Sequence, residues 1–169
     1  MLEAYLELLE EGYFEVKFAF EGLADENVWK RPAEGLLSVG ELAGHIAYWE
    51  AIKLAGEGGK PAPDLAKCKV SSPLIDHRFR YYSTTVATPP SEEHLAMTAE
   101  QVCNELLRVH NEAVAYFKAL NPDLESCPPG WELGNDYRFF LKYAVFHVAY
   151  HTGQMYSARH FLGEEAPDN

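Results

Sequence analysis

The strongest constraint on the fold is a spacing of apolar residues at alternating intervals of four and three. It recurs in separate segments of the chain and is the period of a helix with one buried face. The first segment runs over Leu2, Leu6, Leu9, Tyr13, Val16, Phe20 and Leu23. Another runs over Leu95, Ala99, Val102, Leu106, Val109, Ala113, Tyr116 and Leu120. Helices of this kind bury their apolar faces against one another, so the pattern predicts a helical bundle.

Two further segments have helical signals, but polar and small residues lie on the face expected to point inward. One begins at Ser38, which forms a capping box with Glu41. Its expected inward residues are Leu42, His45, Trp49 and Ile52. The other begins at a cap on Asn135 or Asp136 and ends at Gly163. Its expected inward residues are Ala144, His147, His151, Gln154 and Ala158, where a purely structural helix would carry Leu or Ile.

A connector from Gly56 to Pro90 separates the helical segment that begins at Ser38 from the one that runs over Leu95 to Leu120. It contains Pro61, Pro63, Pro73, Pro89 and Pro90 and lacks strong periodicity. A connector of this length can cross over a bundle, so the helices that it joins need not be antiparallel neighbours. We therefore predict an all-α four-helix bundle with a long crossover between helices 2 and 3. The 169 residues are expected to form one domain, 1–169.

Composition excludes several classes of partner and favours one compartment. The formal net charge is −12, which disfavours binding to nucleic acid phosphates or to anionic membrane surfaces. No apolar run is long enough to span a bilayer, and the N-terminal segment lacks the basic region of a secretion signal. The cysteines Cys68, Cys103 and Cys127 are odd in number and form no CxxC motif. Reduced thiols and a cytoplasmic location are therefore expected.

His147 and His151 are the first candidates for chemistry. Their spacing of four leaves the rings about 40° apart around a helix and about 6 Å apart along it. Neutral imidazole nitrogens bind zinc and nickel, so such a pair can share one ion. Taken alone, this pair is a weak signal for a metal site, and His45 is better read as a core histidine bonded to a neighbouring hydroxyl or carbonyl. His94 and His110 are expected to be structural, and His160 lies on the opposite face of its helix.

Two motifs taken together resemble a known family. These are WKRPAEGLLSVGELAGHIAYWE at 29–50 and HVAYHTGQMYSARHFLG at 147–163, and they resemble the DinB/YfiT-like family of metal-binding four-helix bundles. The matching positions are His45, His147, His151, Gly153, Gln154, Arg159 and Gly163. The resemblance spans essentially the whole chain. It implies that His45, His147 and His151 hold one divalent metal ion, nickel or zinc. It also implies kinship with thiol-dependent S-transferases, maleylpyruvate isomerase-type enzymes and metal-dependent hydrolases.

Three protein ligands leave one coordination position of the ion open, which is typical of catalytic sites. Thiol transfer to a small electrophile, hydrolysis of a small molecule, and metal or ligand binding without turnover all remain open. We slightly favour thiol transfer, because no carboxylate falls beside the histidines to act as a base. Glu50 lies about 140° from His45 around its helix. Against thiol transfer, no basic cluster for the carboxylates of a thiol cofactor is evident.

Further expectations concern the surroundings of the site and its partners. Tyr48 and Gln154 are candidates for contacts with the metal ligands, and Trp49, Tyr48 and part of the 56–90 connector are expected to wall the pocket. The expected partner is a small-molecule substrate together with a low-molecular-weight thiol, and neither nucleic acid nor membrane. The sequence leaves a homodimer open. Metal affinity is expected to fall below about pH 6, near the pKa of free imidazole.

Overall fold

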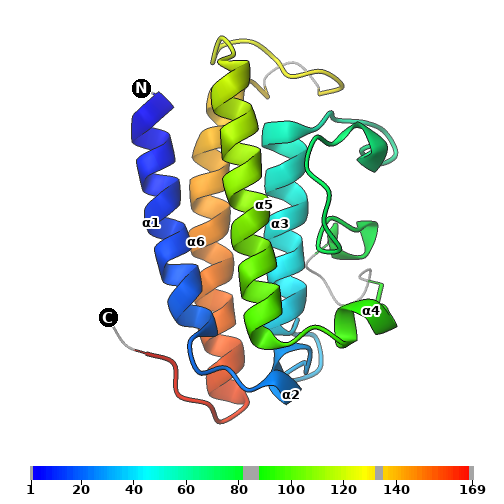
Figure 1. Ribbon diagram of the computed structural model, residues 1–169, viewed down its shortest axis with the longest axis vertical. Coiled ribbons are helices and arrows are strands. Elements are labelled where there is room, and N and C mark those ends of the chain that lie inside the picture. Colours follow the sequence, from blue (N-terminus) through cyan, green and yellow to red (C-terminus); the bar gives the residue numbers. More distant parts are fainter. Residues whose placement is uncertain (1, 82–87, 132–134, 168–169) are drawn as a thin grey trace.

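The computed structural model describes residues 2–81, 88–131 and 135–167, and every regular element in these ranges is helical. Four long helices form the bundle: α1 (Leu2–Phe20), α3 (Val39–Ala55), α5 (Ala99–Leu120) and α6 (Tyr137–Phe161) (Figure 1). The shorter elements are α2 (Asp25–Val28), α4 (Glu92–Leu95) and the 3-10 turns η1 (Leu65–Lys67) and η2 (His77–Phe79). The predicted all-α bundle is confirmed.

The crossover from Gly56 to Ser91 sets the topology of the bundle. Figure 1 shows α1 and α6 running in one direction and α3 and α5 in the other. The helices α3 and α5 are therefore parallel neighbours, which a short loop could not join. Each of α3 and α1 packs against both α5 and α6, and η2 packs on α3. This arrangement is the predicted one, in which a long crossover follows the second long helix.

The helix ends follow their sequence signals. The Ser38 hydroxyl accepts a hydrogen bond from the Glu41 backbone N–H, and the Glu41 carboxylate accepts one from the Ser38 backbone N–H. Asp136 caps the first turn of α6 by accepting from the Phe139 N–H. Asn121 ends α5 in the left-handed conformation. These local contacts satisfy backbone groups that would otherwise have no partner.

The predicted start of the third long helix at Ser91 is wrong. Ser91 caps only α4, and a second capping box between Thr98 and Gln101 starts α5. The break leaves the Met97 carbonyl available to accept a hydrogen bond from the Trp29 indole N–H, at 3.1 Å. Leu95, expected to point inward, is 55% exposed. The sequence signal for the break is the Thr98-to-Gln101 pattern, which is a capping box of its own.

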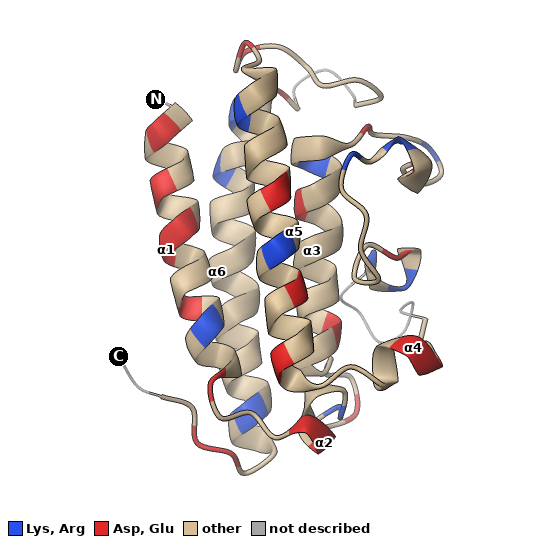
Figure 2. Cartoon of the chain, viewed as in Figure 1, with Lys and Arg blue, Asp and Glu red and all other residues tan. Residues whose placement is uncertain are grey.

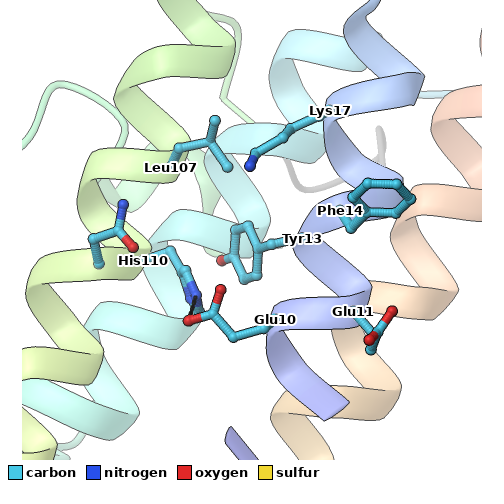
Figure 3. A pocket seen from close by; sticks show the side chains of 8 residues that line it. Glu10, Glu11, Tyr13, Phe14, Lys17, Leu107 and His110 are labelled. Carbon is cyan, nitrogen blue, oxygen red and sulfur yellow. Dashed lines mark ion pairs between the residues drawn. The ribbon is translucent and has the colours of Figure 1, made fainter. Parts of the chain in front are cut away.

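The helix α3 packs against α5, α6 and the crossover element η2, and all of its residues except Trp49 are buried. Burial on every side includes Glu50, whose carboxylate lies 2.7 Å from Nδ1 of His110 on α5. Tyr13 of α1 stacks on the His110 ring with 3.7 Å between ring centroids, and Glu10 lies 3.6 Å from its Nε2 (Figure 3). Burial lowers the pKa of His110, but the hydrogen bond and charge of Glu50 outweigh it and the pKa is raised. This cluster joins α1, α3 and α5 through polar contacts.

The acidic residues of α1 lie on the solvent side of the bundle, as expected. Glu3, Glu7, Glu10 and Glu11 are all exposed, and Figure 2 shows the acidic positions spread along this helix. Within the described ranges, no helix has the length and apolar character that crossing a membrane requires.

Replacing His110 tests the buried cluster. His110→Leu leaves the Glu50 carboxylate buried without its partner, so we expect the free energy of unfolding to fall by about 3–5 kcal/mol. Lys67→Ala, in the crossover, breaks an exposed ion pair with Glu57 and should leave the free energy of unfolding nearly unchanged. Urea unfolding at pH 7 measures both. Equal costs for the two variants would contradict this account.

Candidate metal centre

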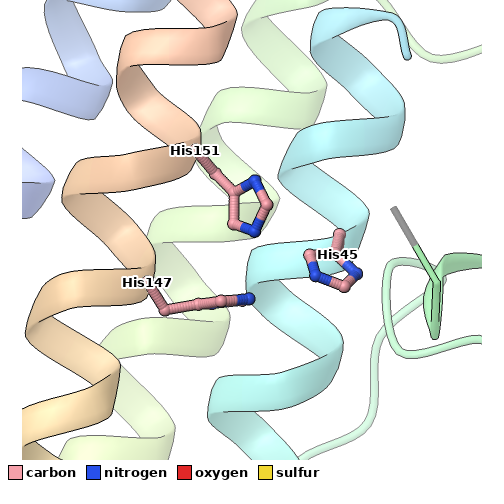
Figure 4. A group of neighbouring side chains, drawn as sticks. All are labelled: His45, His147 and His151. Carbon is pink, nitrogen blue, oxygen red and sulfur yellow. The ribbon is translucent and has the colours of Figure 1, made fainter. Parts of the chain in front are cut away.

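The helices α3 and α6 bring His45, His147 and His151 together inside the bundle (Figure 4). All three are buried, and one ring nitrogen from each lies within 4.8 Å of the other two. Their ring centroids are 4.4 to 4.9 Å apart. His147 and His151 stand one turn apart on α6, and His45 faces them from α3. The structure thus juxtaposes the three residues that the sequence nominated.

The orientation of His45 is fixed from the crossover. Its Nδ1 lies 2.7 Å from the backbone carbonyl of Phe79, which can only accept a hydrogen bond, so Nδ1 carries the proton. The Nε2 atom of the neutral ring then holds the lone pair that a metal needs. Phe79 reaches this position because Gly44 has no side chain. A Cβ at Gly44 would lie 2.5 Å from the Phe79 ring.

His151 is oriented from its own helix. Its Nδ1 lies 2.6 Å from the side-chain oxygen of Gln154, so Nδ1 again donates and Nε2 holds the lone pair. The Gln154 amide in turn lies 3.5 Å from the Tyr150 hydroxyl. The ring of His147 stacks on Tyr143 at a centroid distance of 5.5 Å. Gln154, nominated from the sequence, therefore contacts a candidate ligand directly.

Tyr48 lies on α3 near His45, but its hydroxyl is hydrogen-bonded to His77 of the crossover, at 3.1 Å. Burial raises the pKa of Tyr48 to about 12. The contact with His77 fastens the crossover to α3. A role for Tyr48 beside the metal ligands stays a prediction.

The donor set fits a divalent ion such as zinc or nickel. The three side chains offer imidazole nitrogens, and hydrogen bonds from the opposite ring nitrogens of His45 and His151 fix their tautomers. This is the usual arrangement around metal-binding histidines. The charge state also fits, because neutral rings bind metals.

The histidines are neutral in the folded protein. Burial, followed by the charge of His151, lowers the pKa of His45 to about 3. Burial is also the main cause of the lowered pKa of His147, with the charges of His151 and His45 adding to it. Burial lowers the pKa of His151, although the hydrogen bond that its Nδ1 donates to Gln154 acts in the opposite direction. These lowered pKa values predict that metal affinity falls at a pH below the value near 6 that free imidazole suggests.

A cavity of about 470 Å³ opens onto His45 and His147. Trp49, Arg80 and Tyr81 line it, so the predicted wall of Trp49 and part of the connector is present, whereas Tyr48 is not among the lining residues. The other residues that line it are Lys53, Trp131, Asn135, Phe139, Phe140 and Tyr143. Of the described residues around this cavity, none is acidic and two are cationic. The basic groups that the sequence did not reveal are thus Lys53 and Arg80.

Lys53 had a signal in the sequence that went unused. It follows His45 by eight residues and Trp49 by four, so all three share one face of α3. Burial lowers its pKa to about 7, against the opposing charge of Glu50. Arg80 had no such signal, because the path of the crossover brings it to the cavity. Its carbonyl accepts a hydrogen bond from the Trp49 indole N–H, at 2.9 Å.

The fold and the three buried histidines define an all-helical bundle with a candidate metal centre between two helices. The sequence model of the DinB superfamily matches residues 8–155, and the chain belongs to this superfamily. Searches among curated proteins and among solved structures found no match.

The residues of the last-helix motif divide into two groups in the structure. His147, His151 and Gln154 meet at the candidate metal centre. Arg159 is 1% exposed and donates instead to the backbone carbonyls of Ala19 and Glu21, at 3.1 and 2.8 Å. These carbonyls lie at the C-terminal end of α1, where helices leave acceptors without partners. Arg159 therefore stabilises the bundle next to the site.

The lowered histidine pKa values set the pH dependence of the metal-free protein. The unfolded histidines take up protons near pH 6.5, whereas folded His45 does so only near pH 3. The unfolded state therefore binds more protons in this window, and the free energy of unfolding should fall as the pH drops from 6.5 toward 3. Urea unfolding of chelator-treated protein at several pH values measures the slope. His147→Gln should make the slope shallower, and an unchanged slope would contradict the lowered pKa of His147.

Gly44 offers a test of the contact that orients His45. Gly44→Ala forces the Phe79 ring away from α3, so we expect a loss of about 1–3 kcal/mol in stability and roughly tenfold weaker zinc binding. Gly153→Ala is the matched control, because a Cβ there meets nothing within 4 Å. It should leave zinc affinity unchanged and gain up to about 1 kcal/mol of helix stability. Titration with a competing zinc indicator measures both, and equal affinities would refute the role of Phe79.

Proposed function

We propose that this DinB superfamily protein binds one divalent ion, zinc or nickel, through His45, His147 and His151, and catalyses transfer of a low-molecular-weight thiol to a small electrophile. Support for metal binding comes from the three converging nitrogens and from the hydrogen bonds that fix two of the tautomers. The absence of a disulfide between the described cysteines is compatible with the cytoplasmic location that we propose.

The proposed reaction joins a thiol R–SH to an electrophile R′–X. A sulfur–carbon bond forms, the carbon–X bond breaks, and the thiol proton passes to water while X leaves with the bonding electron pair. A divalent ion at the three histidines would lower the pKa of the thiol and stabilise the thiolate. The chain itself holds the rings in place through Phe79 and Gln154 and surrounds the reactants with the aromatic walls of the cavity.

The observation that favours thiol transfer over hydrolysis is the lining of this cavity. Hydrolysis commonly uses a carboxylate as a general base beside the metal, and none of the described lining residues is Asp or Glu. Both buried carboxylates of α3 are engaged elsewhere, Glu50 with His110 and Glu41 with Ser38 and Arg31. Lys53 and Arg80 also remove the objection that no basic group is available for an acidic thiol cofactor. The lining therefore suits the binding of an acidic thiol better than it suits hydrolysis, which would need a general base for the attacking water.

Metal analysis and turnover together test the proposal. Purified protein should contain about one equivalent of zinc or nickel, and His147→Ala should contain far less, because it removes one of three ligands. With 1-chloro-2,4-dinitrobenzene as electrophile and cysteine or glutathione as thiol, turnover should need both metal and thiol. It should fall by about 100-fold or more in His147→Ala.

The control is Lys118→Gln, at an exposed position of α5, which should keep both metal and turnover. Equal metal content in His147→Ala and the unmodified protein would refute the metal centre. Metal-dependent ester cleavage without a thiol would replace thiol transfer with hydrolysis. Stoichiometric metal with no turnover in either assay would leave a metal-binding protein without catalysis.

A further inference from the structure

Lys53 is a buried cation that forms no ion pair with the described residues, and the Glu50 carboxylate, whose charge acts on it from the same helix, is paired with His110. Its side chain is 9% exposed and lines the cavity beside the candidate metal ligands. Its ammonium lies 4.0 Å from the centre of the Tyr143 ring and 5.3 Å from that of Trp49. These are cation–π contacts, and they are the close contacts that the described residues make with this ammonium.

Arg80 brings a second positive charge to the same cavity from the crossover. One terminal nitrogen donates to the Pro61 carbonyl at 2.6 Å, and the guanidinium lies 5.1 Å from the centre of the Tyr81 ring. Its buried Nε has no hydrogen-bond partner within the described residues. The guanidinium is thus held in place by the Pro61 carbonyl, and its Nε–H can still donate a hydrogen bond to a ligand.

The rest of the wall suits an apolar molecule. Trp131 packs edge-on against Phe140, and Tyr143 lies against His147, so aromatic faces surround the space next to the metal ligands. A second cavity of about 840 Å³ shares Trp49, Arg80 and Trp131 with the first. Both volumes lie in the range of small-molecule sites. The described surface therefore combines unpaired positive charge with aromatic walls.

We propose that this cavity binds a small molecule that carries a carboxylate on an apolar body, with Lys53 and Arg80 contacting the carboxylate and the aromatic side chains packing on the body. The inference deepens the proposed function and rests on it for the idea that the occupant is a reactant. The carboxylate belongs either to the thiol or to the electrophile. Both sources present the same group to the two cations.

The cost of Lys53 to the folded protein supports this assignment. Burial removes the hydration of the Lys53 ammonium, and its two cation–π contacts replace only part of the lost interactions. The lowered pKa of Lys53 has the same cause. A bound carboxylate would supply the missing partner and restore the charge. Anion binding would give the ammonium a role that its two cation–π contacts do not, and methionine could not take that role.

Binding of a neutral and an acidic probe of equal shape tests the proposal without turnover. The probes are 3-phenylpropionate and 3-phenylpropanamide, and isothermal titration calorimetry on zinc-loaded and chelator-treated protein measures their affinities. We expect the acid to bind at least about tenfold more tightly than the amide in both forms. Lys53→Met and Arg80→Met should each reduce this preference severalfold, and Lys118→Met should leave it unchanged. Lys53→Met should unfold at the same temperature as the unmodified protein or higher, which separates lost binding from misfolding.

Three outcomes would overturn the inference. Equal binding of acid and amide, or no binding of either, removes the anion site. If the preference for the acid survives in Lys53→Met and Arg80→Met but is lost when zinc is removed, the carboxylate binds the metal instead of the two cations. Because these readouts need no reaction, a failure of thiol transfer leaves them interpretable.

In turnover assays, pairing 3-mercaptopropionate with 2-mercaptoethanol, and 4-(bromomethyl)benzoate with benzyl bromide, shows which reactant carries the carboxylate. Lys53→Met should raise KM only for the acidic member of the relevant pair.

Discussion

The contact between Phe79 and Gly44 organises the candidate site. Where α3 lacks a side chain, the crossover packs directly on the helix, and the Phe79 carbonyl reaches the His45 ring. One residue later, the Arg80 carbonyl accepts a hydrogen bond from the Trp49 indole N–H. The packing of the crossover on α3 therefore also positions Arg80 at the cavity. A loop of this length has a high ordering entropy, and these buried contacts offset part of it. The bundle helices supply all three histidines, and the crossover determines how His45 is oriented.

Local signals predicted the helices because caps and apolar periodicity act within a few residues. Ser38, Asp136 and Asn121 each behave as their residue type suggests. The break before Thr98 was missed although its capping box was readable, because the apolar period continues through it from Leu95. The position of η2 on α3 could not be predicted in this way. It depends on contacts between residues about 35 positions apart, which no local pattern encodes.

The site shows the same division between local and distant information. The helical spacing of His147 and His151, with the motif that contains His45, was enough to nominate the three residues that the structure brings together. Gln154 was nominated by its place on the same face as His151, and it contacts that ring. Lys53 could have been found by extending the face of His45 by two turns. Arg80, Trp131 and the Phe79 carbonyl could not, because they come from connections between helices.

The net charge of the chain opposes binding of a nucleic acid, whereas the two cations at the cavity favour binding of a small organic acid. The burial of Lys53 explains how both can hold. The formal charge of −12 comes largely from exposed carboxylates such as those of α1, whose fields are screened within about 8 Å at physiological ionic strength. Lys53 is buried, so salt screens its field far less than that of a surface charge. A polyanion needs many surface cations to replace its counter-ions, and the acidic surface opposes it. A single carboxylate needs only a short-range partner inside the cavity. The same chain can therefore repel a nucleic acid backbone and still favour a small organic acid beside its histidines.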